Sequence, residues 1–255
     1  MMRTTRFGLI EMVAWPVTGA LSLLLAWQFL VPAFDVPTYI VPTPVSVLRT
    51  LIKDWPFLLE NAVPTWIEAL LGFALGNGVA VILATAFVYN RRFQAAYFPV
   101  VLFFNTIPVL ALAPIIILIF GLGLLPKVII AALICFFPTL VNTARGLNMV
   151  TANELDLMRV LSASGWETFW RLRAPRAIPL LFASLRIAST TSIIGAIVGE
   201  WIGSNQGLGA VIIQSTFNYQ AERLFAAVTL ASLSGLLFFA IVCLIEGRFR
   251  KFNPA

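Results

Sequence analysis

Long apolar runs alternate with short polar segments along the whole chain. Six of these runs are about 20 residues long, which is the length of helix that crosses a hydrocarbon core of about 30 Å. They cover residues 12–31, 66–89, 97–120, 124–147, 178–202 and 224–245. This pattern predicts an all-α integral membrane protein with six transmembrane helices in one domain over residues 1–255.

The first apolar run follows Arg3 and Arg6, as a cleavable signal sequence would. It is longer than a typical signal core, and no A-x-A-like cleavage site follows it. We therefore expect a true transmembrane helix here.

Two of the polar segments are long, at residues 32–64 and about 148–177. In the first, prolines end the extended chain, and apolar residues then recur at helical spacing, which indicates a short amphipathic helix at the outer membrane interface. These apolar residues are Val45, Leu48, Leu51 and Ile52.

The second long segment predicts two short helices. Thr151 and Glu154 fit a capping box, and the helix after them is expected to end at Gly165. Its apolar stripe consists of Leu155, Met158 and Leu161.

The second short helix, from residue 166, carries three aromatic residues on one face, and two prolines after it are expected to close the segment. The aromatic residues are Trp166, Phe169 and Trp170, and the prolines are Pro175 and Pro179. The apolar faces of the two helices either pack on the protein's own helices or on lipid, or they bind a soluble partner.

Composition supports a membrane protein, because 60% of the residues are hydrophobic and only 11% are charged. The net charge of +6 reflects topology, and we find no nucleic-acid footprint in it. With six spans, twelve cations fall on one side and four on the other, which makes the first side and both termini cytoplasmic. The twelve are Arg3, Arg6, Arg91, Arg92, Arg145, Arg159, Arg171, Arg173, Arg176, Arg248, Arg250 and Lys251; the four are Arg49, Lys53, Lys127 and Arg223.

Metal and redox chemistry have few residues to use. The chain has no histidine, and its two cysteines, Cys135 and Cys243, lie inside apolar runs where buried thiols are expected. We predict no metal site and no catalytic constellation, so the chain is not expected to be an enzyme.

The segment 156–175 resembles the cytoplasmic EAA loop of ABC importer permeases, in which Glu-Ala-Ala is followed after three residues by Gly and after nine more by Ile-x-Leu-Pro. The register is kept, but several identities differ: Asp156, Leu157 and Met158 stand for Glu-Ala-Ala, Ser162 for Gly, and Leu172 to Pro175 for the last element.

Other stretches extend this resemblance over roughly residues 41–249. "FFNTIPVLALAPIIILIFGLG", "FFPTLVNTARGL", "SLRIA", Glu200 and "GLG" follow in the order of permeases from the sulfonate, taurine and nitrate importer group, which also includes permeases for thiamine-precursor pyrimidines and riboflavin. The resemblance implies the type I ABC importer fold in a bacterial inner membrane, with a small anion as the favoured solute and a pyrimidine or riboflavin as the alternative.

The resemblance also implies partners. These are a cytoplasmic ATPase, a second copy of the permease and an extracytoplasmic solute-binding protein. The chain has no G-x-x-x-x-G-K-[ST] sequence, so we expect the ATPase to bind ATP and magnesium. The residues expected to couple to the ATPase are Asp156, Met158, Ser162, Ala163, Ser164, Gly165, Trp166, Phe169 and Pro175.

Polar residues inside the apolar runs are candidates for a translocation pathway. We select Asn105, Thr106, Pro108, Asn142, Thr190 and Glu200. Most single Ser and Thr residues are expected to bond their own helix, and Glu68 and Arg186 are expected to reach the interface. For Glu200, a gate and a helix-packing hydrogen bond both remain open. A secondary carrier is the alternative class, although it would need ion-coupling groups and often internal repeats.

Overall fold

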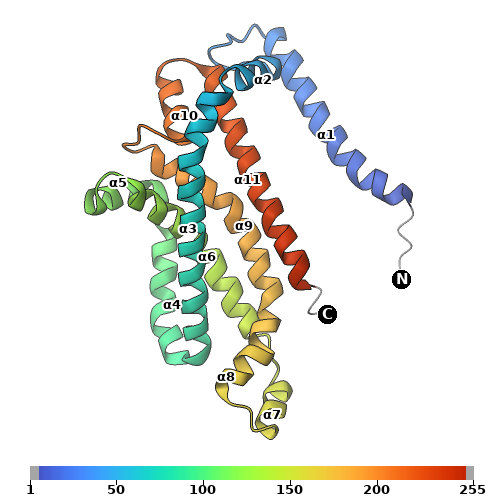
Figure 1. The fold of residues 1–255 in the computed structure, drawn as a ribbon, viewed down its shortest axis with the longest axis vertical. Helices are drawn as coiled ribbons and strands as arrows, with labels where there is room; N and C mark the ends of the chain where they lie inside the picture. The colour runs from blue at the N-terminus through green and yellow to red at the C-terminus, as the bar shows by residue number, and fades with distance from the viewer. Residues whose placement is uncertain (1–5, 251–255) are drawn as a thin grey trace. The chain divides into compact units, whose positions relative to one another are not determined.

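The computed structural model describes residues 6–250, which are almost entirely helical (Figure 1). In this part of the chain the elements are α1 (Arg6–Ala33), α2 (Pro44–Lys53), α3 (Trp55–Tyr89), α4 (Arg91–Thr106), α5 (Val109–Phe120), α6 (Leu124–Leu147), α7 (Ala152–Val160), α8 (Gly165–Thr168), the π-helix η1 (Phe169–Arg173), α9 (Ala174–Glu200), α10 (Leu208–Phe217) and α11 (Ala221–Arg250). The prediction of an all-α protein is confirmed.

Five of the described helical segments are long and apolar enough to cross a membrane. The sixth candidate is the pair α4 and α5, which counts as one span only if its two parts are taken together. The predicted run 124–147 coincides with α6, whereas α3 begins eleven residues before the predicted start at Trp66.

The prediction of a single continuous helix over residues 97–120 is wrong. The axes of α4 and α5 meet at 100° across a break at Ile107 and Pro108. Ile107 is extended, with φ −74° and ψ 126°, because the ring of a following proline disfavours the helical region. The apolar pattern continues across the break, so hydropathy alone could not detect it.

The described residues form two compact units. Unit 1 is the described part of Met1–Leu59 together with Val211–Thr229, and unit 2 is Glu60–Ala210 with the described part of Leu230–Ala255. Helices α6 and α9, and the segment between them, belong entirely to unit 2.

In unit 1, α2 confirms the predicted short helix. Thr43 caps its first turn, where its side chain accepts a hydrogen bond from Ser46 N, and Pro44 occupies the first turn. Only Val47 is buried in this helix. Most of the predicted apolar stripe is exposed, namely Val45, Leu48 and Ile52, which agrees with a helix whose apolar face is expected at the membrane interface.

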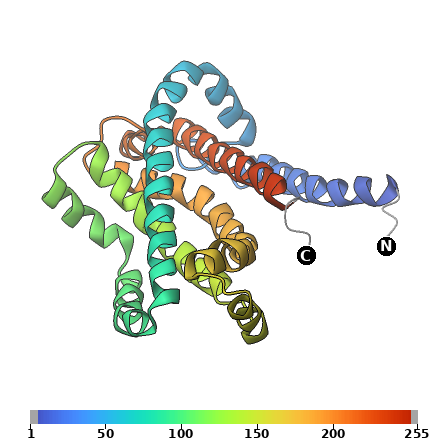
Figure 2. The ribbon, with the colours of Figure 1, turned by 60° about the horizontal axis from the view of Figure 1, so that its bottom comes forward.

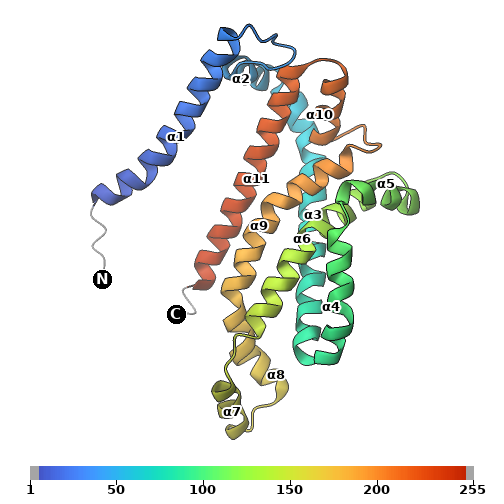
Figure 3. The same cartoon turned by 180° about the vertical axis from the view of Figure 1, so that it is seen from behind.

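Unit 2 is centred on α6, which lies beside α9 (Figure 3). Small residues allow its neighbours to approach closely, as is common between membrane helices. A Cβ atom at Gly76 of α3 would lie 2.9 Å from Ala132 Cα, and one at Gly195 of α9 would lie 2.6 Å from Ala131 Cα. Helices α3 and α9 therefore both pack almost backbone to backbone against α6.

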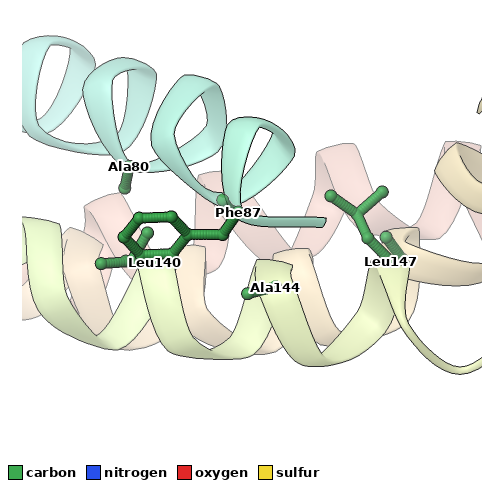
Figure 4. Packing of buried hydrophobic residues seen from close by; sticks show 7 residues of the cluster. Ala80, Phe87, Leu140, Ala144 and Leu147 are labelled. Atoms are coloured by element: carbon green, nitrogen blue, oxygen red, sulfur yellow. The ribbon is translucent and has the colours of Figure 1, made fainter. Parts of the chain in front are cut away.

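Farther along the same helices, a hydrophobic cluster joins α3, α6 and α9 (Figure 4). Phe87 is completely buried there against α6 residues that include Leu140 and Ala144. The rings of Phe93 and Phe98 from α4 pack against Phe87 at centroid distances of 5.6 and 6.3 Å. This cluster stabilises the end of unit 2 from which α7 and α8 project.

Candidate functional site

The segment between α6 and α9, which we call the coupling segment (residues 148–177), contains α7, α8 and η1. Figures 1 and 2 place α7 and α8 beyond the ends of α6 and α9 in unit 2. The predicted capping box of α7 is confirmed: Thr151 and Glu154 bond each other's backbone N–H groups. The Thr151 backbone N–H, followed by its hydroxyl, holds the pKa of Glu154 below its ordinary value, and the charge of Arg176 adds to the effect.

The expected end of this helix at Gly165 is wrong, because α7 already ends at Val160. Ser162 adopts a left-handed conformation, with φ 53°, and Ala163 N donates to Met158 O at 2.9 Å. Gly165 instead begins α8.

A second capping box, which was not predicted, begins α8. The Ser164 side chain accepts from the N–H of Glu167, and the Glu167 carboxylate accepts from the N–H of Ser164. The Ser-x-x-Glu spacing was a usable sequence signal for it.

Three polar interactions of the described residues hold α7, α8 and η1 against the long helices of unit 2. Arg176 of α9 forms an ion pair with Glu154 of α7. Arg173 Nη1 donates to the carbonyl of Leu147 at 2.9 Å, and the Tyr89 hydroxyl donates to the carbonyl of Gly165 at 3.1 Å. The segment is therefore fixed to α3, α6 and α9.

The three aromatic residues of the second short helix do not share one environment. Trp166 and Trp170 are 72% and 54% exposed, and their rings meet edge-on at 5.5 Å. Phe169 packs against the hydrophobic cluster around Phe87, with the Tyr89 ring 6.2 Å away. Two tryptophans are thus available to a partner, whereas Phe169 anchors the segment.

Pro175 does not close a loop, contrary to the prediction. The chain stays helical from Gly165 to Glu200, and Pro175 lies in the first turn of α9. The π-helix η1 precedes it, and the N–H of Ala174 donates to the carbonyl of Phe169, five residues earlier. A π-turn changes the carbonyl register just before proline, which lacks an N–H.

The other predicted coupling residues lie at the surface or partly buried. Asp156 is exposed and pairs with Arg159 at 2.6 Å, one turn later on α7. Met158 and Ala163 are half-buried.

The residues predicted to line a pathway are dispersed in the structure. Asn105, Thr106 and Pro108 are exposed at the break between α4 and α5. Asn142 and Thr190 are half-buried on α6 and α9. Thr190 donates to its own helix at Ile187 O, as do Ser189, Thr191 and Ser192 to carbonyls three or four residues earlier.

Glu200 is completely buried at the end of α9. Its carboxylate accepts from Thr65 Oγ1 at 2.7 Å and from Gly209 N at 2.6 Å. Gly207 has φ 108°, and any Cβ atom there would overlap the Glu200 carboxylate. The glycines after α9 therefore let the backbone close around this side chain.

The expectation that Glu68 reaches the interface is wrong, since it is only 2% exposed. Lys127, predicted to be a loop cation, donates to Glu68 Oε1 at 2.7 Å and to Ser204 Oγ at 2.9 Å. A charged residue within the apolar run of α3 was the signal for Glu68. Its partner Lys127 lies 59 residues away, which no local pattern indicates.

Arg186 also has a partner in unit 2, because its guanidinium donates to Glu246 Oε2 at 2.9 Å. Cys135 is buried, as expected, and Cys243 is half-buried.

The chain is similar along most of its length to permeases of bacterial importers. The formylaminopyrimidine transport permease protein ThiX of Halalkalibacterium halodurans is 32% identical over 91% of this chain and 92% of its own length. The riboflavin transport system permease protein RibX of Chloroflexus aurantiacus is 31% identical over 93% and 91%, respectively. SsuC of Bacillus subtilis, named for aliphatic sulfonates transport, is 26% identical over 97% and 89%.

The fold has a counterpart among solved structures. A crystal structure of the MetNI methionine ABC transporter in inward-facing conformations matches with a TM-score of 0.59 and 18% identity, over 75% of this chain and 94% of the matched chain. The model of the family described as "binding-protein-dependent transport system inner membrane component" matches residues 76–251. The chain therefore belongs to this family of ABC importer permeases and has the type I importer fold.

Proposed function

We propose that this chain forms the solute pathway of an ATP-driven importer, and that a separate cytoplasmic ATPase, which binds ATP and magnesium, drives it through the coupling segment. Family membership supports the permease role. The observation that carries the coupling role is the exposed pair Trp166 and Trp170 on a segment otherwise fixed to unit 2. A rigid segment with an exposed aromatic surface can transmit a partner's motion to α6 and α9.

The ATPase contact is tested by separating the exposed aromatic residues from the anchoring one. Replacing Trp166 and Trp170 with Ala should weaken co-purification with the ATPase, because aromatic residues buried at an interface contribute about 2 kcal/mol or more to binding. The melting temperature of the chain should stay unchanged, because both side chains are exposed. Phe169→Ala should lower the melting temperature, because this ring packs inside the chain. Unchanged ATPase binding in the double tryptophan variant would contradict the proposal.

Two copies of the chain are proposed to enclose the pathway. Five spans, or six with the α4–α5 pair, are few to surround a solute, and a C₂ homodimer is the simplest closed arrangement. We further propose that the membrane is the bacterial inner membrane, with both termini in the cytoplasm. An extracytoplasmic binding protein would deliver the solute from the other side.

For the solute we propose a small nitrogen heterocycle of the pyrimidine or flavin type. ThiX and RibX, both more than 30% identical to this chain, are named for formylaminopyrimidine and riboflavin. Two cations that lie against helices of unit 2, Lys127 and Arg186, are paired with Glu68 and Glu246 and so offer an anion no free charge. A small anion such as a sulfonate, taurine or nitrate is the second candidate, favoured by the similarity to SsuC.

The solute is tested in proteoliposomes that contain this chain, its ATPase and its binding protein. Formylaminopyrimidine or riboflavin should stimulate ATP hydrolysis and be taken up, whereas taurine and nitrate should not. The reverse preference would favour the anion. Uptake by this chain alone, without the ATPase, would instead indicate a secondary carrier.

A further inference from the structure

Three charged side chains from three different helices meet inside unit 2. Glu68 comes from α3, Lys127 from the first turn of α6 and Glu200 from the last turn of α9. The two glutamates are 2% and 0% exposed, and the lysine side chain is 13% exposed. Burial of an ion costs several kcal/mol unless partners compensate for it, so the charge of this cluster must be nearly balanced.

The Glu200 carboxylate accepts from Thr65, which lies one turn before Glu68 on the same face of α3, so the two carboxyl groups lie close together. Glu68 Oε1 accepts from Lys127, but Glu68 Oε2 is buried without a donor among the residues that the structure describes. An ionised carboxylate can only accept hydrogen bonds. Two ionised carboxylates this close together would repel each other and leave this oxygen unsatisfied.

No second cation balances the pair among the described residues. The remaining groups that bond to the cluster are neutral: Thr65 Oγ1, Ser204 Oγ and the backbone N–H of Gly209. The neighbouring helix α5 (Val109–Phe120) has no ionisable side chain. With both carboxylates ionised, the cluster would carry a net charge of −1, and with one added proton it would be neutral.

We propose that Glu68 and Glu200 bind one proton between them, and that this proton is released when α3, α6 and α9 separate at this end of unit 2. A proton supplies the donor that the carboxyl pair lacks and cancels its excess charge. Separation of the helices admits water, which solvates both carboxylates and removes the need for the proton. Closure of this end of unit 2 is therefore linked to proton binding, whichever solute the protein carries.

The sign of the pH effect follows from linkage. The folded cluster holds a proton that the hydrated carboxylates do not, so alkaline pH should destabilise the folded chain. Glu200→Gln replaces a protonated carboxyl group with a neutral amide of similar shape. The melting temperature of this variant should therefore equal that of the wild type at mildly acidic pH and exceed it at alkaline pH.

The full-length protein in lipid nanodiscs provides the test, with the melting temperature measured across pH. Glu60→Gln is the matched control, because Glu60 is an exposed carboxylate on the same helix, and it should follow the wild type. The double variant Glu68→Gln/Glu200→Gln leaves the Lys127 charge unpaired, so its melting temperature should be lower than that of the wild type at every pH. Adding Lys127→Met should restore its stability.

Two outcomes of the melting experiment would overturn the proposal. One is a Glu200→Gln variant that follows the wild type at every pH. The other is a melting temperature that depends on sodium or calcium at constant pH, which would place a metal cation where we place the proton.

An infrared measurement keeps the proposal testable even if the variants fail to fold. The wild-type protein at neutral pH should show the carbonyl stretch of a protonated carboxyl group, and this band should shift in D₂O. Absence of the band in the wild type would also overturn the proposal.

Discussion

Ser162 is the residue at which the coupling segment departs most clearly from ordinary side-chain geometry. Its φ of 53° closes the turn after α7, where the resemblance to permease loops places a glycine. A left-handed conformation costs an L-residue roughly 1–2 kcal/mol. Glycine avoids this strain but loses about 0.5–1 kcal/mol more backbone entropy on folding. The strain is the larger of the two effects.

We therefore predict that Ser162→Gly raises the free energy of unfolding by up to about 1 kcal/mol. Ala163→Gly is the control and should lower it, because the backbone of Ala163 has no positive φ to relieve. Chemical denaturation in mild detergent measures both. Equal effects of the two variants would show that Ser162 is not strained.

Glu154 makes the coupling segment sensitive to acid. Its pKa lies below the ordinary value of 4.5, chiefly because the Thr151 backbone N–H bonds the carboxylate. A lowered folded-state pKa means that this stabilisation is present above about pH 4.5 and is lost as pH falls through the folded value.

Glu154→Gln should retain part of the cap and lose the ion pair with Arg176. We expect faster amide hydrogen exchange in α7 at neutral pH and a weaker acid dependence than in the wild type. The contrary finding is an acid dependence that the substitution leaves unchanged.

At the scale of elements, α3, α6 and α9 are held together by small residues more than by large ones. Lipid tails are as apolar as the side chains, so close backbone packing supplies much of the attraction between these helices. Gly76 faces Ala132 of α6 with no space for a side chain, whereas Gly78, two residues later, faces open space. These two positions on α3 allow a matched comparison.

We predict that Gly76→Leu destabilises the protein by about 1–3 kcal/mol, because it forces α3 away from α6. Gly78→Leu should be close to neutral, since no atom lies within 4 Å of a Cβ at that position. Melting temperatures of the two purified variants test this. Similar losses in both would contradict the packing explanation, because leucine has the higher helix propensity and Gly78 has no neighbour to displace.

At the scale of the whole molecule, the distribution of cations predicts the orientation in the membrane. The bent pair α4 and α5 matters here, because a pair that did not return the chain across the membrane would reverse every later segment. The twelve-to-four asymmetry holds only if the pair counts as one crossing. Orientation is thus a test of the fold as well as of the charge pattern.

Single cysteines should be introduced at Ser164, Lys251 and Lys53 in a chain that lacks Cys135 and Cys243. A membrane-impermeant thiol reagent should label the first two only from the cytoplasmic side and the third only from outside. Lys251 lies outside the described residues. Outside labelling of the cysteine at position 164 would remove the ATPase contact from the proposal.

Much of the architecture is encoded locally and could be predicted from the sequence. The apolar runs identify a helical membrane protein, the bounds of α6 follow from hydropathy, and Thr151 with Glu154 marks the start of α7. Each of these signals depends on residues within a few turns of one another. The register of the EAA-like loop likewise placed the coupling segment and led to the family.

Tertiary structure alone decided which side chains meet. Phe169 faces the protein while Trp166 faces outward, although both share one helical stripe in the sequence. Glu200 bonds Thr65, 135 residues away, and so lies near Glu68, one turn later on α3, because glycine and alanine contacts bring α3, α6 and α9 together. Local patterns determine helices, but close packing between helices determines which buried charges share a site.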